Sequence, residues 1–321
     1  DTSRGLVGSE MCIRDRACAN APVPDIEVRE GRHTEVGGIG ISRVLPTKGR
    51  RTIGAWCFVD LMTPDDLDEP MPLEIGPHPH IGLQTVTWLF AGAALHGDSL
   101  GTEQLIRPGQ LNLMTSGRGI AHAEDGRARE RIGAPVGGIA GAQLWIALPE
   151  GTRHGESRFQ HLEELPSADL PNGDASVMIG RYAEAESGAV VDTPLIGLDA
   201  RFDGSTVIAT DPTFEYGVVP LDRSLKVHDV VVEPGSLALV PTGLSELPVE
   251  VDGGRARMLV LGGEPLGEPI QMWWNFVART KGEIADAWRA WQGHDTDRFA
   301  PVPSDLPRID APRPPWVPAG G

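Results

Sequence analysis

The chain has little cysteine and no long hydrophobic run. Its 321 residues include three cysteines, Cys12, Cys18 and Cys57, whose spacing fits neither a disulfide framework nor a zinc motif. We therefore expect a reducing, cytoplasmic setting, with Cys57 as a buried and unreactive thiol in the apolar run GAWCFVD. No stretch approaches the roughly 20 apolar residues that cross a bilayer. No apolar segment typical of a signal peptide is present either, so the sequence predicts neither a membrane protein nor a secreted one.

Positive charge is also scarce. The chain has 28 lysines and arginines against 45 aspartates and glutamates, which gives a net charge of −17 and a pI of about 4.9. Such a field repels the phosphates of nucleic acids and anionic membrane surfaces, so neither is an expected partner. The balance is typical of a soluble protein and is compatible with a basic protein partner. We expect a monomer.

Glycine and proline, in contrast, are abundant, with 40 and 28 residues. They predict many turns and leave little room for long helices, which favours an all-β protein of short strands. The segments TIGAWCFVDLM and LQTVTWLFAGAAL are apolar enough to form strands that are buried on both faces.

One helix is expected near the end of the chain, over residues 281–292. The segment TKGEIADAWRAWQG begins with a capping box formed by Thr280 and Glu283, and its apolar residues recur at helical spacing. We expect its tryptophans to pack on a barrel wall. The proline-rich residues 301–321 are expected to lie extended over the surface.

An internal repeat organises the sequence. RPGQLNLMTSG (107–117) and EPGSLALVPTG (233–243) both fit P-G-x-L-x-L-x-x-x-G, which describes a tight turn, a strand and a second turn. We interpret the repeat as two antiparallel β-barrel or jelly-roll domains, over residues 25–150 and 175–300. The second domain would include the helix, and the polar residues 151–174 would form a linker.

Two short motifs in the first half carry side chains that bind metals. In GPHPHIG, His78 and His80 are two residues apart, and in GIAHAED the same spacing separates His122 from Glu124. Residues at i and i+2 of a strand share a face, so two neighbouring strands would present four ligands together. Either pair alone is more typical of a turn or a solvated strand end. Their joint occurrence in one repeat favours a site for iron, copper, nickel or zinc.

Glycines flank both motifs, and we expect them to let the backbone bend and bring the ligands together. These are Gly76, Gly82, Gly117 and Gly119. Five other histidines are isolated between polar residues and are expected on the surface. They are His33, His154, His161, His228 and His294. His96 is expected in a turn at a barrel rim, although together with Asp98 it could instead orient a metal ligand.

The second copy of the repeat lacks the histidines. Pro108 and Pro234 are equivalent, and this offset of 126 places Pro248 at the position of His122 and Glu250 at that of Glu124. No H-x-H motif occurs in the second half. The sequence therefore predicts that the second domain is free of metal.

Three segments carry a family resemblance. PHPHIGLQTVTWLF, LIRPGQLNLMTSGRGIAHAED and PIQMWWNFVART resemble the pirin family of bicupins, over residues from about 25 to about 302. The resemblance implies two cupin barrels with a single iron ion (Fe2+ or Fe3+), or another divalent metal, in the first. It implies His78, His80, His122 and Glu124 as the ligands. The wider cupin pattern has a metal-binding glutamate where this chain has Gln84, so Gln84 is not expected to bind the metal.

The resemblance also implies a function. Four ligands in octahedral geometry leave two open positions, and several pirins resemble quercetin 2,3-dioxygenases, with Glu124 as the catalytic base that removes the flavonol proton. Trp88, Phe90 and Met114 lie on or near the ligand strands and could face the substrate, although core packing is favoured for each. One alternative is a non-enzymatic regulator that binds a protein partner according to the state of its metal. A closed structural zinc site is another.

The first residues differ in character from the rest. LVGSEMCIRDR (6–16) resembles the translation of an adapter used in sequencing libraries. We therefore expect residues 1–24 to be foreign to the fold.

Overall fold

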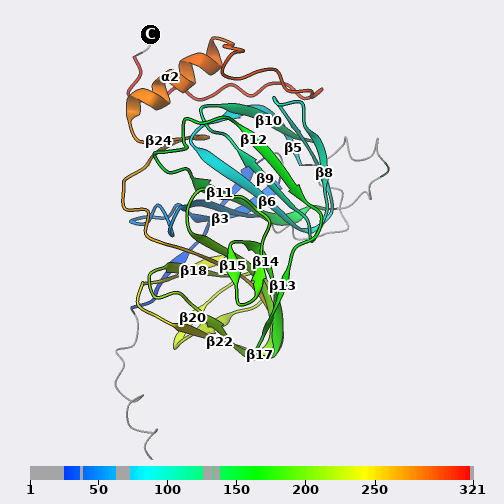
Figure 1. The fold of residues 1–321 in the computed structure, drawn as a ribbon, viewed down its shortest axis with the longest axis vertical. Helices are drawn as coiled ribbons and strands as arrows, with labels where there is room; N and C mark the ends of the chain where they lie inside the picture. The colour runs from blue at the N-terminus through cyan, green and yellow to red at the C-terminus, as the bar shows by residue number, and fades with distance from the viewer. Residues whose placement is uncertain (1–24, 37–38, 63–72, 126–132, 134–137, 319–321) are drawn as a thin grey trace, which may run out of the picture.

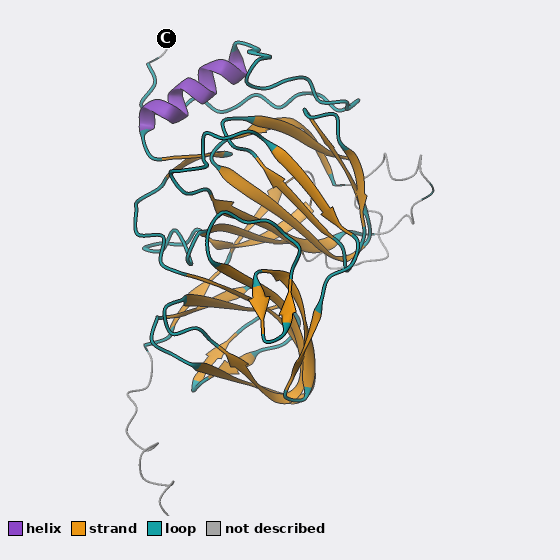
Figure 2. Cartoon of the chain, in the orientation of Figure 1, coloured by secondary structure: helices purple, strands orange, loops and turns teal. Residues whose placement is uncertain are grey.

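The computed structural model describes residues 25–36, 39–62, 73–125, 133 and 138–318, so the amino-terminal segment 1–24 lies outside the described residues. Strands make up two stacked barrels, and one helix lies at the end of the first (Figure 2). The prediction of an all-β protein with a carboxy-terminal helix is confirmed. Among the described residues, no helix has the length and apolar character needed to cross a membrane.

The first barrel is formed by a seven-stranded and a four-stranded antiparallel sheet. The larger has the order β12-β9-β6-β11-β4-β3-β2 and the smaller the order β5-β10-β7-β8. Their strands are β2 (Arg32–Val36), β3 (Ile39–Leu45), β4 (Trp56–Met62), β5 (Glu74–His80), β6 (Leu83–Ala91), β7 (Ala94–Asp98), β8 (Glu103–Ile106), β9 (Leu111–Thr115), β10 (Ile120–Asp125), β11 (Ala140–Ala147) and β12 (Arg158–Leu162).

The second barrel is formed by a nine-stranded sheet whose main path is β1-β21-β18-β22-β17-β14-β13, with β19 and β20 branching from β22. Two further hairpins are β15–β16 and β23–β24. The strands are β1 (Glu27–Glu30), β13 (Ser167–Leu170), β14 (Gly173–Ile179), β15 (Arg181–Tyr182), β16 (Ala185–Glu186), β17 (Leu195–Ala209), β18 (Glu215–Pro220), β19 (Leu225–Val227), β20 (Val230–Val232), β21 (Ser236–Val240), β22 (Glu246–Gly263), β23 (Gln271–Trp273) and β24 (Phe276–Ala278).

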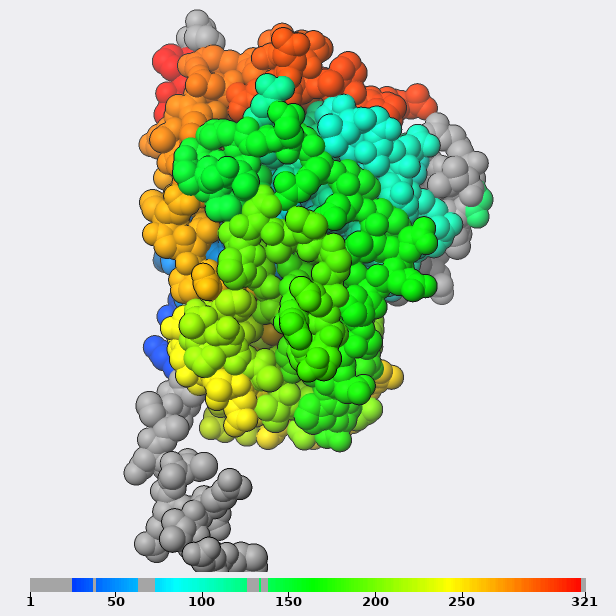
Figure 3. All heavy atoms as spheres, in the orientation of Figure 1, coloured from blue at the N-terminus to red at the C-terminus, as the bar shows by residue number. Residues whose placement is uncertain are grey.

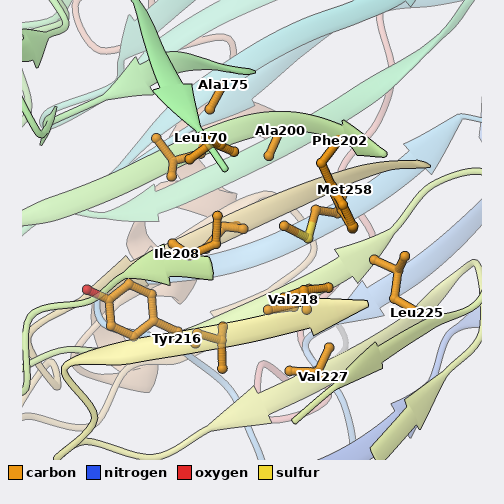
Figure 4. Close-up of a cluster of buried hydrophobic side chains, with 14 of the residues drawn as sticks. Leu170, Ala175, Ala200, Phe202, Ile208, Tyr216, Val218, Leu225, Val227 and Met258 are labelled. Atoms are coloured by element: carbon orange, nitrogen blue, oxygen red, sulfur yellow. The ribbon is translucent and has the colours of Figure 1, made fainter. Parts of the chain in front are cut away.

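The interior of the second barrel is apolar. Figure 4 shows Phe202, Val218 and Met258 among the side chains that fill it, and all three are fully buried. Alternate residues of each strand supply this core, while the residues between them face solvent or the first barrel.

The two barrels pack against each other through their large sheets. Val86 and Leu144 of the first barrel share one hydrophobic cluster with Leu259 of the second. Trp88 Nε1 donates to Asp199 Oδ2 at 2.9 Å across the same boundary. Strands β4 and β6 of this sheet are therefore buried on both faces, as their apolar sequences predicted, because one face lines the barrel and the other meets the second barrel.

The two copies of the repeat form β9 and β21, and each of these strands lies next to an edge strand of its sheet, β12 and β1 respectively. The offset of 126 residues, which aligns the two repeat copies, does not align the strands that follow them. Pro248 and Glu250 lie on the outer side of β22, where Glu250 is 3.8 Å from Lys226, whereas Leu247 and Val249 are buried in the core. A shift of one residue exchanges the two faces of a strand, so aliphatic residues point inward here, where the first barrel has His122 and Glu124.

The ends of the two barrels differ from the expected division of the chain. The expected linker contains β12, which pairs with β9 of the first barrel, and β13, which pairs with β14 of the second. Strand β1, expected in the first domain, pairs with β21 of the second. Edge strands are half exposed and therefore polar, which is why composition alone suggested a linker.

Helix α2 (Lys281–Gln292), expected in the second domain, instead packs on the first barrel (Figure 1). Its capping box is present as predicted, with Thr280 Oγ1 accepting from the N–H of Glu283 and the carboxylate of Glu283 accepting in return. Buried side chains of the helix meet Ile81 and Ala121 in one cluster. In the space-filling view, the carboxy-terminal residues cover the end of the first barrel (Figure 3).

The proline-rich tail is extended, as expected, and it is fixed to the first barrel. The N–H of Ile309 donates to the carbonyl of Pro77 on β5 at 2.9 Å. Trp291 and Trp288 of the helix donate their indole N–H groups to the carbonyls of Ile309 and Ala311. The tryptophans of the helix thus have the packing role that was predicted, between the barrel and the tail.

Candidate metal centre

Three histidines meet on the inner face of the smaller sheet of the first barrel. His78 and His80 lie two residues apart on β5, so their side chains share a face, and His122 on β10 pairs directly opposite His78. One ring nitrogen of each lies within 4.8 Å of the others, and all three side chains are buried. The structure brings together the three histidines that the sequence singled out.

The positions of the ring nitrogens fit a single metal ion. His80 Nε2 and His122 Nε2 are 3.0 Å apart, the distance expected of adjacent octahedral donors that each lie about 2.1 Å from one ion. His78 Nδ1 lies 2.9 Å from the carbonyl oxygen of Gly76 and must donate to it, because a carbonyl only accepts. The lone pair of His78 therefore resides on Nε2, where a metal can bind it.

Burial keeps these imidazoles neutral. It lowers the pKa of His78 to about 4, and together with the neighbouring imidazoles it lowers the pKa of His80 and His122 well below the ordinary value. His80 Nδ1 is buried without a hydrogen-bond partner of normal geometry, although the nearby backbone of Asn275 favours its protonation. Only neutral imidazole binds a metal, so the cluster is ready for a cation at neutral pH.

Glu124 lies on the same strand as His122, lines the same cavity and is 6% exposed. The pairing of β10 with β5 shifts by one residue between these two, which is a bulge of the kind that re-aims a side chain. The carboxylate lies outside the 4.8 Å group of imidazoles. Burial raises its pKa to about 7. The role of Glu124 as fourth ligand and base stays a prediction.

The glycines around the ligands serve two purposes. Gly82, with a φ of 69°, makes a turn, and its N–H donates to the carbonyl of Gly117 at 2.9 Å. At Gly76 a Cβ atom would lie 1.9 Å from the carbonyl oxygen of Pro307. Part of the glycine pattern therefore shapes turns, as expected, and part lets the tail approach β5 closely.

Two aromatic side chains line the same cavity as the histidines, which has a volume of about 380 Å³, and one of them, Trp145, contacts His80 edge to face at 5.2 Å between ring centroids. The rings of Phe58 on β4 and Trp145 on β11 stack with centroids 3.9 Å apart at an angle of 13°. Arg43 lies over Phe58 at 4.5 Å and binds Asp60 through two hydrogen bonds of 2.7 Å. Arg43, Phe58 and Trp145 thus form one packed part of the cavity lining, which the ion pair holds in place.

Part of the cavity lining comes from the end of the chain. Trp274 and Asn275 come from the turn between β23 and β24, and Ile309 comes from the tail. Trp274 has a φ of 51°, a left-handed conformation that is uncommon for a bulky residue and tends to occur at functional sites. The site of the first barrel is therefore completed by residues from beyond the second.

The three residues that the sequence suggested for the substrate, Trp88, Phe90 and Met114, do not line this cavity. Trp88 faces the second barrel, as does Phe90, whose ring lies 4.3 Å from the guanidinium carbon of Arg257. Met114 is buried in β9 and belongs to the core. Core packing, the favoured role for each, is what the structure shows. Phe58 and Trp145 were missed; a signal was the charged Asp60 two residues after Phe58 in an otherwise apolar strand.

His96 does not lie in a rim turn, so that expectation was wrong. It lies within β7, is 4% exposed, and pairs opposite Glu124. Its Nδ1 is 3.3 Å from His122 Nδ1, and its Nε2 is 3.2 Å from Asp98 Oδ2. The alternative interpretation, a residue that contacts a metal ligand, describes this geometry.

The other histidines lie outside the cluster. His33, His154 and His294 are exposed, as predicted, whereas His161 and His228 are partly buried. Gln84 is also separate from it, because its amide donates to Thr115 Oγ1 and to the carbonyl of Val190.

Relatives agree with this architecture. A Pseudomonas aeruginosa protein named "Putative quercetin 2,3-dioxygenase" is 45% identical over 283 residues, which cover 87% of each chain. A crystal structure of quercetin 2,3-dioxygenase from Acinetobacter baumannii superposes with a TM-score of 0.84 and 41% identity, covering 92% of this chain and 97% of that one. A bacterial pirin from Escherichia coli in complex with nickel(II) shares the fold at 16% identity, with a TM-score of 0.57 over 75% and 99% of the two chains.

Family models match both barrels. The pirin model matches residues 38–146, and the model of the pirin C-terminal cupin domain matches residues 198–297. The first match contains the histidine cluster, and the second covers the apolar barrel and helix α2. With its two cupin barrels and its histidine cluster, this chain belongs to the pirin family.

Proposed function

We propose that this protein is a metal-dependent dioxygenase that acts on a flavonol such as quercetin. The observation that carries the proposal is the cluster of three buried, neutral imidazoles that lines one cavity together with the stacked pair Phe58 and Trp145. Its volume of about 380 Å³ falls within the range of roughly 300–1,000 Å³ that is typical of small-molecule sites. The names of the two most similar relatives described above point to the same reaction.

The metal proposed is iron, held by His78, His80 and His122 with Glu124 as the fourth ligand. Other divalent metals that favour imidazole would fit the same donors. When bound, iron would supply a Lewis acid that favours the deprotonated flavonol and organises its reaction with O₂. The donor set suits this better than a closed zinc site, because the cavity beside the imidazoles leaves room for a substrate.

The residues of the chain would divide the remaining tasks. The rings of Phe58 and Trp145 would contact the planar substrate, and Trp274, which lines the same cavity, would limit water access. Glu124 would accept the proton of the flavonol hydroxyl. Burial raises its pKa to about 7 in the metal-free site, and a bound cation would favour the ionised carboxylate that a base requires.

The setting proposed for this reaction is the cytoplasm. Cys57 is a free thiol on β4 that is fully buried, and burial raises its pKa to about 12. A thiol of that kind is unreactive, as expected from the sequence, and it needs no oxidising compartment.

The test is loss of quercetin absorbance together with consumption of O₂ by the iron-loaded protein. Wild-type protein should turn over, and Glu124→Gln should abolish turnover even where metal remains bound. Glu250→Gln, which changes an exposed glutamate of the second barrel, should leave turnover unchanged. If folded, metal-loaded wild-type protein shows no turnover with any metal, the enzymatic proposal fails. A metal-dependent regulator that binds a protein partner would then be the better description.

A further inference from the structure

A hydrogen-bonded chain leads from Asp98 through His96 to His122. Asp98 Oδ2 is 3.2 Å from His96 Nε2, and His96 Nδ1 is 3.3 Å from His122 Nδ1. His122 Nε2 then faces His80 Nε2 at 3.0 Å, within the imidazole cluster. All of these side chains are buried, so water does not compete for the contacts.

The first link fixes where the proton of His96 resides. Asp98 Oδ1 accepts the backbone N–H groups of Leu100 and Thr102 at 2.8 and 3.1 Å, which leaves Oδ2 for His96. Burial opposes the charged form of Asp98, but hydrogen bonds from His96 and from these two N–H groups outweigh it, and the pKa lies below its ordinary value. A carboxylate only accepts, so His96 Nε2 must carry the hydrogen.

The second link fixes the tautomer of His122. A neutral imidazole has one N–H group and one lone pair. With its hydrogen on Nε2, His96 presents the lone pair of Nδ1 to His122, which therefore carries its own hydrogen on Nδ1. The lone pair of His122 then resides on Nε2, the nitrogen that faces the cluster.

We propose that Asp98 and His96 are positioning residues that hold His122 as its Nδ1–H tautomer and so direct the Nε2 lone pair at the metal. The proposal rests on the metal site of the proposed function and not on its substrate. It explains why two polar residues are buried in β7, where neither lies in the imidazole group itself.

The ring of His96 is held in place from the other side as well. Phe159 of β12 stacks on it with centroids 4.6 Å apart at an angle of 20°. Strand β12 belongs to the segment expected as a linker, so that segment supports the site. Residues that hydrogen-bond to a metal ligand typically raise metal affinity by about 10–100-fold.

Asp98→Asn is the sharpest variant, because it keeps the shape and changes one hydrogen-bonding role. Its amide oxygen still accepts from Leu100 and Thr102, so its NH₂ group faces His96 Nε2. His96 must then move its hydrogen to Nδ1 and donate to His122, which places the hydrogen of His122 on Nε2. The same substitution acts through the wrong tautomer in the serine protease triad, which is a known example.

The tautomers can be read directly from ¹⁵N chemical shifts of the histidines in metal-free protein, with no substrate present. Wild type should show His122 with its hydrogen on Nδ1, and Asp98→Asn should show it on Nε2, with metal affinity about 10–100-fold weaker. His96→Phe should leave His122 without a fixed tautomer, and His96→Asn should restore Nδ1–H in part, because its oxygen can accept in place of Nδ1.

His161→Phe is the matched control, since His161 belongs to the same barrel but contacts Asn112 outside the cluster. It should change neither the tautomer of His122 nor the metal affinity. The proposal is overturned if His122 keeps the Nδ1–H tautomer in both Asp98→Asn and His96→Phe, or if their metal affinity stays within twofold of wild type. A wild-type protein that shows the tautomer but no turnover would refute the proposed reaction and leave this inference standing.

Discussion

The two barrels share a strand motif and fill their interiors in opposite ways. In the second, alternate residues such as Phe202 and Met258 close the interior with apolar side chains (Figure 4). In the first, His78, His80 and His122 occupy the inner face of the smaller sheet beside an open cavity. The same architecture can therefore fill its interior with apolar side chains, which stabilises the fold, or leave part of the interior as a cavity lined by polar side chains.

The outer surfaces of the two barrels show the reverse contrast, because here it is the first barrel that is covered by apolar contacts. The strand β10, which bears His122, is covered on its outer side by helix α2 and the tail, so that Ala121 is fully buried. The equivalent stretch of β22 exposes Glu250 to solvent. A barrel with a polar interior has less core of its own, and the carboxy-terminal segment adds apolar contact from outside.

The largest expected effect separates the barrels by metal content. His122→Ala should reduce bound metal from about one ion per chain to almost none, because two imidazoles and a carboxylate hold an ion far less tightly than three imidazoles and a carboxylate. The second barrel should stay folded, since its core does not include this residue. Metal analysis after gel filtration measures both, with His161→Ala as the control. Stoichiometric metal in the variant would show that the ligands are wrongly assigned.

A substitution in the core of the second barrel should lower stability and leave metal binding unchanged. Phe202 is fully buried in the second barrel, so Phe202→Ala should lower the free energy of unfolding by about 3–5 kcal/mol through the cavity that it creates. Metal affinity of the folded protein should stay within twofold of wild type. Urea denaturation and metal titration check this, and a large loss of affinity would mean that the two interiors are coupled.

Acid should weaken metal binding through Glu124 before it acts through the histidines. The pKa of Glu124 is raised to about 7, so it binds a proton as the pH falls through that value and must lose it to bind a metal. The pKa of His78 is lowered to about 4, so it remains neutral over the same range.

Metal affinity should therefore fall about tenfold for each pH unit between about 6 and 5, following one proton. Titrations across this range measure the slope. Glu124→Gln should bind more weakly at pH 7.5 and lose the dependence. A profile that is unchanged in the variant would assign the proton to another group.

The smallest effect concerns the contact between the barrels. Trp88→Phe removes the indole N–H that donates to Asp199, while Arg257 still binds that carboxylate through two hydrogen bonds. The free energy of unfolding should fall by about 1–3 kcal/mol, with metal affinity unchanged. Separate unfolding transitions for the two barrels in this variant would show that the contact couples them. A denaturation curve identical to that of wild type would mean that it contributes nothing.

Local patterns in the sequence were sufficient to predict several features of the fold and of the candidate site. The two-residue spacing of His78 and His80 predicted their common face, and the capping box at Thr280 predicted where helix α2 begins. Both depend on residues a few positions apart, where backbone geometry decides the outcome.

Contacts between distant segments could not be predicted in the same way. Three features depend on how far-separated segments meet: the pairing of β1 with β21, the place of α2 on the first barrel and the presence of Trp274 in the cavity lining. His96 was ambiguous for the same reason: its sequence neighbours suggest a turn, and only the pairing of β7 with β10 places it against His122. The half-exposed strand β12 has a polar composition, which is why the sequence predicted a linker there.

The central claim is that the first barrel holds one metal on His78, His80 and His122, and the most direct measurement is anomalous diffraction at the iron edge from crystals of the iron-loaded protein. We predict a single peak, bonded to an Nε2 atom of each of these histidines and to the carboxylate of Glu124, with open positions facing the cavity. A peak in the second barrel, no peak in a metal-loaded crystal, or an ion closed by four tetrahedral ligands would contradict the account.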